Sequence, residues 1–242
     1  MRFGAAEADL LRAEAEKRFR LRLTDEQIAR FCAFGDLLVA GNEKMNLTAI
    51  TEPREIVRKH FLDSLALLPH VRQALADAPP SAKPLLDLGT GAGFPGLPLK
   101  LAWPAPEWVL ADALGKRRLF LDAAIAALGL QGVRTLGGRA ETWGRDASWR
   151  GQFACVTARA VAPLPVLTEY ALPLLCLGGT LLAAKGPAAG AEAEQAARAL
   201  RLCGGEVRDI VDCTPAAGAE KRFLLVVVKT AETPALYPRA PG

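Results

Sequence analysis

The residues best suited to chemistry lie in one glycine-rich segment, residues 85–96, with the sequence LLDLGTGAGFPG. An apolar run leads into glycines that let the backbone approach a ligand closely, and a helix is predicted to begin just beyond. Gly91, Gly93 and Gly96 also match the G-x-G-x-x-G spacing of dinucleotide-binding turns, where a pyrophosphate lies at a helix N-terminus. The segment therefore predicts a nucleoside cofactor, either S-adenosylmethionine or a nicotinamide dinucleotide.

Two features favour S-adenosylmethionine over the dinucleotide. Asp87 stands two residues before the first glycine, where it would repel a pyrophosphate but tolerate a cationic methionine end. An antiparallel hairpin predicted at residues 206–211 and 223–229 departs from the all-parallel dinucleotide fold. Asp112 ends the next predicted strand, 19 residues after Gly93, and suits the two ribose hydroxyls. Because both cofactors contain adenosine, Asp112 supports the pocket without choosing its occupant.

Short apolar runs alternate with helical patterns on both sides of this segment. This alternation is typical of an α/β fold with a mostly parallel sheet covered on both faces. The predicted strands, before the hairpin, are residues 85–88, 107–111, 132–136, 153–157 and 178–184. The predicted helices between them are residues 94–101, 115–129, 163–175 and 187–203.

The first 76 residues instead predict a helical extension. Residues 5–22 are rich in strong helix formers, and a T-x-x-Q capping box at Thr24–Gln27 begins a second helix with Ile28, Phe31, Leu37 and Leu38 on its apolar positions. A third helix is predicted after Thr51. The proline-rich stretch at 77–84 marks a boundary. The expected organisation is a helical extension at 1–76, a cofactor-binding domain at 85–230 and a tail at 231–242.

Composition limits the function classes. With 51% hydrophobic and 23% charged residues, the chain has the composition of a globular protein. Five cysteines without C-x-x-C spacing, and only two histidines, predict neither a disulfide framework nor a metal site. The N-terminus lacks the apolar core of a secretory signal, and the apolar run at 223–228 is too short to cross a bilayer. We expect a cytoplasmic protein without a membrane partner.

Positive charge is concentrated rather than spread. Residues 112–160 contain eight basic and four acidic residues, so this window carries the whole net charge of +4. A local basic excess suits a phosphate-bearing partner, although an ordinary solvated surface explains it equally well.

Seven segments in order carry a resemblance to a known family. They are residues 46–50 (NLTAI), 60–65 (HFLDSL), 85–96, 112–118 (DALGKRR), 138–141 (GRAE), 157–160 (TARA) and 178–186 (GGTLLAAKG). In these segments the chain resembles the bacterial 16S ribosomal RNA guanine-N7 methyltransferases, RsmG or glucose-inhibited division protein B. The resemblance covers roughly residues 35–190, and the first 25 residues and the tail match little.

The resemblance implies a Rossmann-like class I methyltransferase fold with a seven-stranded sheet, and S-adenosylmethionine as the cofactor. Its implied substrate is a guanine in a decoding-region loop of 16S rRNA, within the 30S subunit, and we expect a monomer. Three alternatives stay open: a methyltransferase of another RNA site or substrate, a nicotinamide-dependent oxidoreductase, and a non-catalytic RNA-binding assembly factor.

The resemblance also implies roles for individual residues at the cofactor. Gly89 and Phe94 would contact it with the glycine turn, Asp112, Ala113 and Leu114 would face the ribose, Ala140 and Glu141 would edge the adenine, and Arg159 would face cofactor or substrate. Taken locally, Phe94 could belong to the core, Glu141 could be a solvated helix start and Arg159 an ion-pair partner.

Several cations are candidates for contact with RNA. Lys116, Arg117 and Arg118 fall in the first turn of a predicted helix, where the helix dipole disfavours cations, unless that helix starts later. Arg139 and Lys185 end neighbouring elements, although Lys185 could be a solvated cap. His60 is predicted to be a hydrogen-bonded structural histidine.

No catalytic residue is assigned by the sequence. The N7 atom of guanine loses no proton on methylation, so its reaction needs orientation rather than a general base. Consistently, residues 157–160 read TARA instead of the [DN]-P-P-[FY] of enzymes that methylate exocyclic amines.

Overall fold

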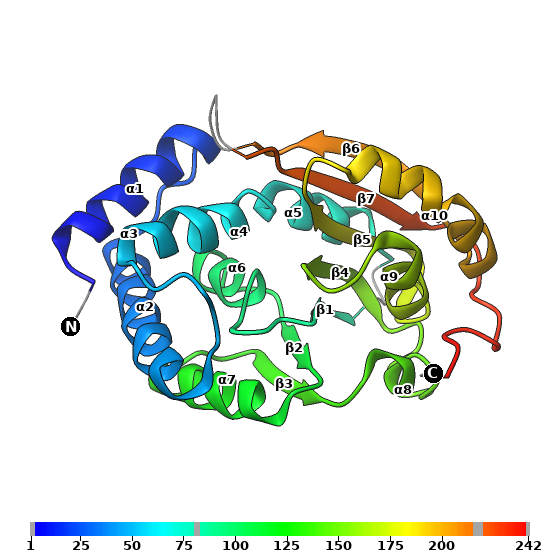
Figure 1. Ribbon diagram of the computed structural model, residues 1–242, viewed down its shortest axis with the longest axis horizontal. Coiled ribbons are helices and arrows are strands. Elements are labelled where there is room, and N and C mark those ends of the chain that lie inside the picture. Colours follow the sequence, from blue (N-terminus) through cyan, green and yellow to red (C-terminus); the bar gives the residue numbers. More distant parts are fainter. Residues whose placement is uncertain (1–2, 80–82, 215–219, 241–242) are drawn as a thin grey trace. The chain divides into compact units, whose positions relative to one another are not determined.

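The computed structural model describes residues 3–79, 83–214 and 220–240 (Figure 1). It contains a seven-stranded sheet with the order β3-β2-β1-β4-β5-β7-β6, in which the pairs β2–β3, β1–β4 and β4–β5 are parallel and β5–β7 and β6–β7 are antiparallel. This confirms the predicted α/β fold with an antiparallel C-terminal hairpin. The chain forms two compact units, residues 1–68 with 90–137 and residues 69–89 with 138–242.

The first unit opens with helices. They are α1 (Ala5–Phe19), α2 (Asp25–Met45), α3 (Pro53–Ile56), the π-helical turn η1 (Val57–Leu62) and α4 (Asp63–Leu65). The predicted capping box is present, since Thr24 Oγ1 accepts from the Gln27 amide at 3.2 Å and Gln27 Oε1 accepts from the Thr24 amide at 2.9 Å. The third predicted helix is confirmed in position, but it contains the π-helical turn, which residue periodicity does not reveal.

An aromatic cluster forms the core of these helices. The Phe61 side chain on η1 is fully buried, and its ring centroid lies 5.2 Å from that of Phe31, 5.8 Å from that of Phe34 and 6.0 Å from that of Phe3. Of the apolar positions predicted for α2, Ile28, Phe31 and Leu38 are buried whereas Leu37 is half-buried. The cluster fixes α1 and α2 against the π-helical turn.

The rest of the first unit consists of alternating helices and strands. They are α6 (Gly96–Ala102), β2 (Trp108–Asp112), α7 (Gly115–Ala127) and β3 (Val133–Gly137). Strands β2 and β3 pair in register from Trp108↔Val133 to Asp112↔Gly137. Both strands end at the same edge, so the chain leaves the sheet there at Asp112.

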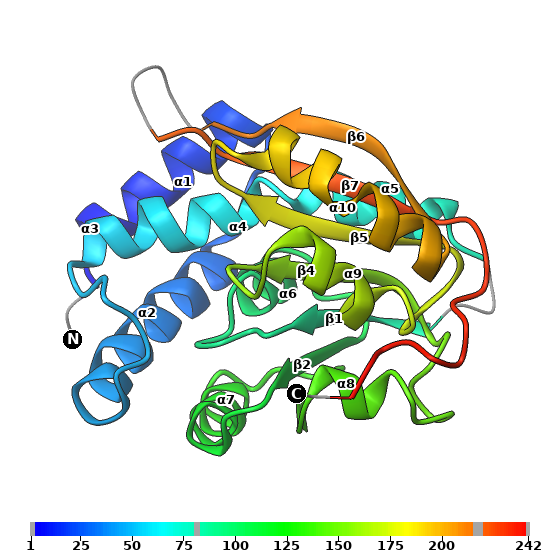
Figure 2. The same cartoon turned by 45° about the vertical axis from the view of Figure 1, so that its right-hand side comes forward.

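The second unit contains the larger part of the sheet. Its elements are α5 (Leu68–Asp77), which begins one residue before the unit, β1 (Lys83–Leu88), α8 (Ala140–Trp143), β4 (Phe153–Arg159), α9 (Leu164–Ala171), β5 (Leu175–Lys185), α10 (Ala189–Cys203), β6 (Gly205–Asp212) and β7 (Phe223–Lys229). Helices α9 and α10 pack side by side in front of β4 and β5 in both views (Figures 1 and 2). The predicted strands and helices match within a few residues, except that β5 begins earlier than predicted and α5 and α8 were not predicted.

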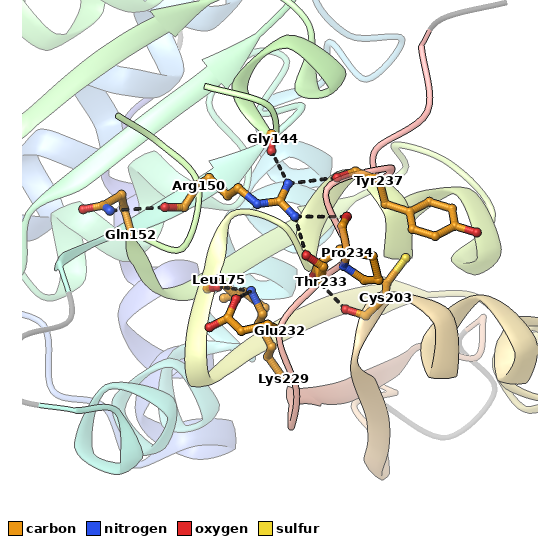
Figure 3. Close-up of polar contacts among 10 residues, drawn as sticks. All are labelled: Gly144, Arg150, Gln152, Leu175, Cys203, Lys229, Glu232, Thr233, Pro234 and Tyr237. Atoms are coloured by element: carbon orange, nitrogen blue, oxygen red, sulfur yellow. Dashed lines mark hydrogen bonds and ion pairs between the residues drawn. The ribbon is translucent and has the colours of Figure 1, made fainter. Parts of the chain in front are cut away.

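The C-terminal segment is held in place by Arg150 (Figure 3). Its guanidinium donates to the carbonyl oxygens of Thr233 at 2.5 Å, Gly144 at 2.6 Å and Tyr237 at 2.8 Å. Four residues earlier in the chain than Thr233, the Lys229 ammonium is buried and donates to Leu175 O at 2.7 Å, and burial lowers the pKa of Lys229. The described part of the predicted tail is therefore ordered by backbone hydrogen bonds.

The predicted boundary at 77–84 and both chain ends include residues outside the described ranges, namely 80–82, 1–2 and 241–242. Within the described ranges, no helix combines the length and apolar character needed to cross a membrane.

Candidate functional site

In the first unit, the glycine turn is fastened to Asp112. Gly91 and Gly93 have φ angles of +61° and +100°, a region that side chains other than hydrogen disfavour. The Gly91 amide donates to Asp112 Oδ2 at 2.9 Å, and the Thr90 amide donates to the Ala111 carbonyl at 3.0 Å. The end of β2 therefore shapes the turn directly.

The Asp112 carboxylate also organises the segment that follows it. Its Oδ1 accepts from the Leu114 amide at 2.9 Å, while Arg117 Nη1 lies 3.3 Å from Oδ2. Asp112 is buried, whereas Ala113 is exposed and Leu114 is 46% exposed. These contacts bring together three of the predicted cofactor residues, Gly91, Asp112 and Leu114.

Helix α7 begins at Gly115, so the alternative that it starts later is wrong. Its three first-turn cations differ in environment. Arg117 is paired with Asp112, which offsets the unfavourable helix dipole. Lys116 and Arg118 are exposed. Their contact with RNA stays a prediction.

Phe94 connects the glycine turn to the aromatic cluster. It is buried, and its ring stacks on that of His60 with centroids 4.5 Å apart and planes inclined by 22°. His60 Nε2 and Thr48 Oγ1 share a hydrogen bond at 2.9 Å. The prediction of a hydrogen-bonded structural histidine is therefore confirmed, and Phe94 belongs to the core whatever it also contacts.

In the second unit, Asp87 and Gly89 lie at the end of β1. The Asp87 side chain is fully buried, and Thr157 Oγ1 on β4 donates to its Oδ1 at 2.9 Å. Gly89 has a φ of +66°, and a Cβ built there would lie 2.7 Å from Val161 Cγ2. A side chain at residue 89 would thus displace the loop that follows β4.

Glu141 is buried on α8, so the alternative of a solvated helix start is wrong. Tyr170 on α9 donates a hydrogen bond to it. Burial raises the pKa of Tyr170, and the Glu141 carboxylate raises it further. Arg139 is the N-cap residue of α8, and Ala140 is its first helical residue. Glu141 is therefore held by a second helix in its own unit.

The loop after β4 contains an unusual backbone conformation. Arg159, which is half-buried, ends β4, and Ala160 follows with a φ of +56°. The left-handed conformation costs a residue other than glycine roughly 1–2 kcal/mol, so the surroundings of Ala160 must impose it.

Lys185 ends β5 close to this loop. Its Nζ donates to Ala162 O at 2.8 Å and to Glu192 Oε2 at 2.7 Å, and only 10% of its side chain is exposed. The alternative of a solvated cap is therefore wrong. The contact of Lys185 with RNA stays a prediction.

Comparison with known proteins identifies the family. The model of the GidB family, described as rRNA small subunit methyltransferase G, matches residues 27–222. The ribosomal RNA small subunit methyltransferase G of Desulfitobacterium hafniense (strain Y51) is 48% identical over 234 residues, covering 97% of this chain and 94% of the relative. That of Roseiflexus castenholzii (strain DSM 13941 / HLO8) is 46% identical over 222 residues, covering 92% of each.

The chain belongs to this family.

Solved structures agree in fold. A protein from Corynebacterium glutamicum superposes with a TM-score of 0.54 at 19% identity, covering 93% of this chain and 97% of that one. The cofactor-bound protein Rv0187 from MTB also gives 0.54 at 19% identity, covering 82% and 91%. Family and fold together confirm the predicted class, an S-adenosylmethionine-dependent methyltransferase, and exclude the nicotinamide-dependent oxidoreductase.

The residues at the turn fit this cofactor. A Cβ built on Gly91 meets no heavy atom within 4 Å, so the backbone is open to a ligand at that point. The exposed apolar side chain of Leu114 beside the Asp112 carboxylate offers an apolar surface and a hydrogen-bond acceptor, which suit a base and a ribose.

Sequence reasoning missed several partners of these residues, namely Thr48, Glu192, Tyr170 and the Thr157 hydroxyl. Thr48 and Thr157 lie inside the family motifs, so the motifs could have drawn attention to them. Glu192 and Tyr170 lie in amphipathic helical stretches without a distinguishing pattern.

Proposed function

We propose that this protein transfers a methyl group from S-adenosylmethionine to N7 of a guanine in a decoding-region loop of 16S rRNA. We further propose that it acts on the 30S subunit, as a monomer, in the cytoplasm. The observation that carries the proposal is the family match over residues 27–222. The glycine turn fastened to Asp112 supports it independently, because a non-catalytic assembly factor has no need of such a turn.

The proposed cofactor residues come from both units. In the first unit they are Gly91, Gly93, Phe94, Asp112, Ala113 and Leu114, and in the second unit Asp87, Gly89, Ala140, Glu141 and Arg159. The open backbone at Gly91 would receive the ligand, and Asp112 would accept hydrogen bonds from ribose hydroxyls. Ala140 and Glu141 would bound the adenine.

The chemistry needs little from the protein beyond positioning. When bound, S-adenosylmethionine supplies an electrophilic methyl group on a sulfonium. Guanine N7 offers an in-plane lone pair and has no proton to lose, so no side chain has to act as a base. The protein must hold the nucleobase in line and exclude water, which is catalysis by proximity and orientation.

RNA geometry limits the target to an accessible guanine. In an A-form helix, N7 faces a deep, narrow major groove that side chains cannot enter, so the target lies in a loop or is splayed out. We propose Lys116, Arg117 and Arg139 as RNA contacts. The exposure of Lys116 supports its role, because a phosphate can reach that side chain.

One experiment tests the assignment. Unmethylated small subunits and radiolabelled S-adenosylmethionine are incubated with the protein, and the labelled base is mapped. We expect label on N7 of one guanine of 16S rRNA. Label on another RNA site or on protein would support the alternative of a different methyltransferase substrate. Tight binding of subunits without any transfer would favour an assembly factor.

The sequence division into a helical extension at 1–76, a methyltransferase domain at 85–230 and a tail at 231–242 is kept as a proposal. The hydrogen bonds of Arg150 to Thr233 and Tyr237 suggest that most of the tail folds with the domain. Truncation at residue 230 tests this division, since an independent tail would leave the melting temperature unchanged.

A further inference from the structure

We propose that Lys185 and Glu192 form a clamp that positions the loop at residues 160–164 for methyl transfer. Lys185 then acts through this loop and not by contacting RNA. The inference rests on the proposed function, since the loop follows Arg159, which we place at the cofactor or substrate.

The clamp joins the ends of several elements within the second unit. Lys185 ends β5, and its Nζ donates to Ala162 O in the loop at 2.8 Å. Glu192 lies in the first turn of α10. Its Oε2 accepts from Lys185 Nζ at 2.7 Å and from the Leu164 amide, at the start of α9, at 2.9 Å. One carboxylate oxygen therefore ties β5, α9 and α10 together at the loop.

The loop needs such support at both ends. At its start, Arg159 is fixed by pairing of β4 with β5, and Ala160 then adopts a φ of +56°. A residue other than glycine keeps this conformation only where its surroundings over-determine it. At its end, Pro163 offers no side-chain cap to α9, and Glu192 supplies an acceptor there instead. The clamp thus holds the end of the loop against the strain at its beginning.

The loop is in direct contact with the glycine turn's first residue. A Cβ built on Gly89 would lie 2.7 Å from Val161 Cγ2, so loop and turn pack without free space. A shift of residues 160–164 would therefore move both Gly89 and Arg159. Displacements of this size reduce transfer rates because the reacting atoms must lie within a narrow range of distance and angle.

The surroundings of Lys185 do not favour a phosphate contact. Its side chain is 10% exposed, and two of the three ammonium hydrogens are directed to Ala162 and Glu192. Lys116, by contrast, is exposed at the start of α7. A phosphate could reach Lys116 without breaking an internal ion pair.

The test compares Lys185→Met, Glu192→Ala and the double variant, with Lys116→Ala as the contrasting cation. Transfer to small subunits is measured as kcat and KM, and subunit binding is measured against salt concentration. For the three clamp variants we expect kcat to fall roughly 10- to 100-fold with KM and the salt slope unchanged. The double variant should be no worse than either single variant. Lys116→Ala should instead raise KM and reduce the salt slope by about one.

The proposal is overturned if Lys185→Met raises KM and reduces the salt slope while Glu192→Ala leaves kcat unchanged. A second readout needs no activity: amide hydrogen exchange at Leu164 should quicken in Lys185→Met and in the milder Glu192→Gln, each compared with the wild type in folded protein. Unchanged exchange would also reject the clamp. If the wild type transferred no methyl group, the proposed function would fail, and exchange at Leu164 would still decide the clamp.

Discussion

Replacing Asp112 with asparagine tests the central geometry of the site, the link between β2 and the glycine turn. The buried carboxylate accepts from two backbone amides, those of Gly91 and Leu114, each at 2.9 Å. An asparagine side chain has one oxygen and one amino group, so it can accept from only one of these amides and would direct a donor at the other.

The expected magnitude follows from the lost contact. A hydrogen bond to a charged group contributes about 1.5–3 kcal/mol. The ion pair with Arg117, whose side chain is 34% exposed, adds at most about 1 kcal/mol and is left out. We expect Asp112→Asn to lower the melting temperature by about 3–12 °C, taking about 2–4 °C for each kcal/mol in a chain of this size.

The assay is thermal denaturation followed by circular dichroism, together with calorimetric titration with S-adenosylhomocysteine. Binding should weaken roughly tenfold or more, because the same carboxylate is proposed to meet the ribose. Asp122→Asn is the matched control: Asp122 is exposed on α7 and accepts from Thr135 Oγ1 at 2.6 Å, which an amide oxygen can still do. If both variants melted and bound alike, the argument from Asp112 would be refuted.

Three further predictions concern stability and the C-terminal segment. Phe61→Ala should lower the free energy of unfolding by about 3–5 kcal/mol, since a fully buried ring is removed; urea denaturation measures this, and a loss below about 1 kcal/mol would contradict it. Burial lowers the pKa of His70 below its usual 6.5, so the unfolded chain binds more protons and stability is lost as pH falls through this value. His70→Gln should therefore flatten the melting temperature between about pH 7 and pH 5, and an unchanged slope would refute this assignment. Arg150→Ala should expose residues 230–240 to limited proteolysis, whereas Arg201→Ala, at an exposed position on α10, should not; equal cleavage would contradict the anchoring role.

The sequence by itself determined the elements and the position of the cofactor turn. These features depend on local physics: the capping box of Thr24 and Gln27, the apolar periodicity of α2 and the glycines after β1 each act within a few residues. The ordered motifs also determined the family, because their identity and spacing are properties of the chain.

Only the tertiary structure decided which partner each functional side chain meets. Lys185 and Ala162 are 23 residues apart, and Gly91 and Asp112 are 21 residues apart, yet each pair is joined by a hydrogen bond. The burial of Glu141 beneath Tyr170 and the ordering of the C-terminal segment by Arg150 likewise depend on packing between distant segments. A side chain's charge and length are written in the sequence, but its burial and partners are fixed only when the strands and helices assemble. For that reason, the sequence located the candidate residues while the structure separated those open to a ligand from those that hold the site in shape.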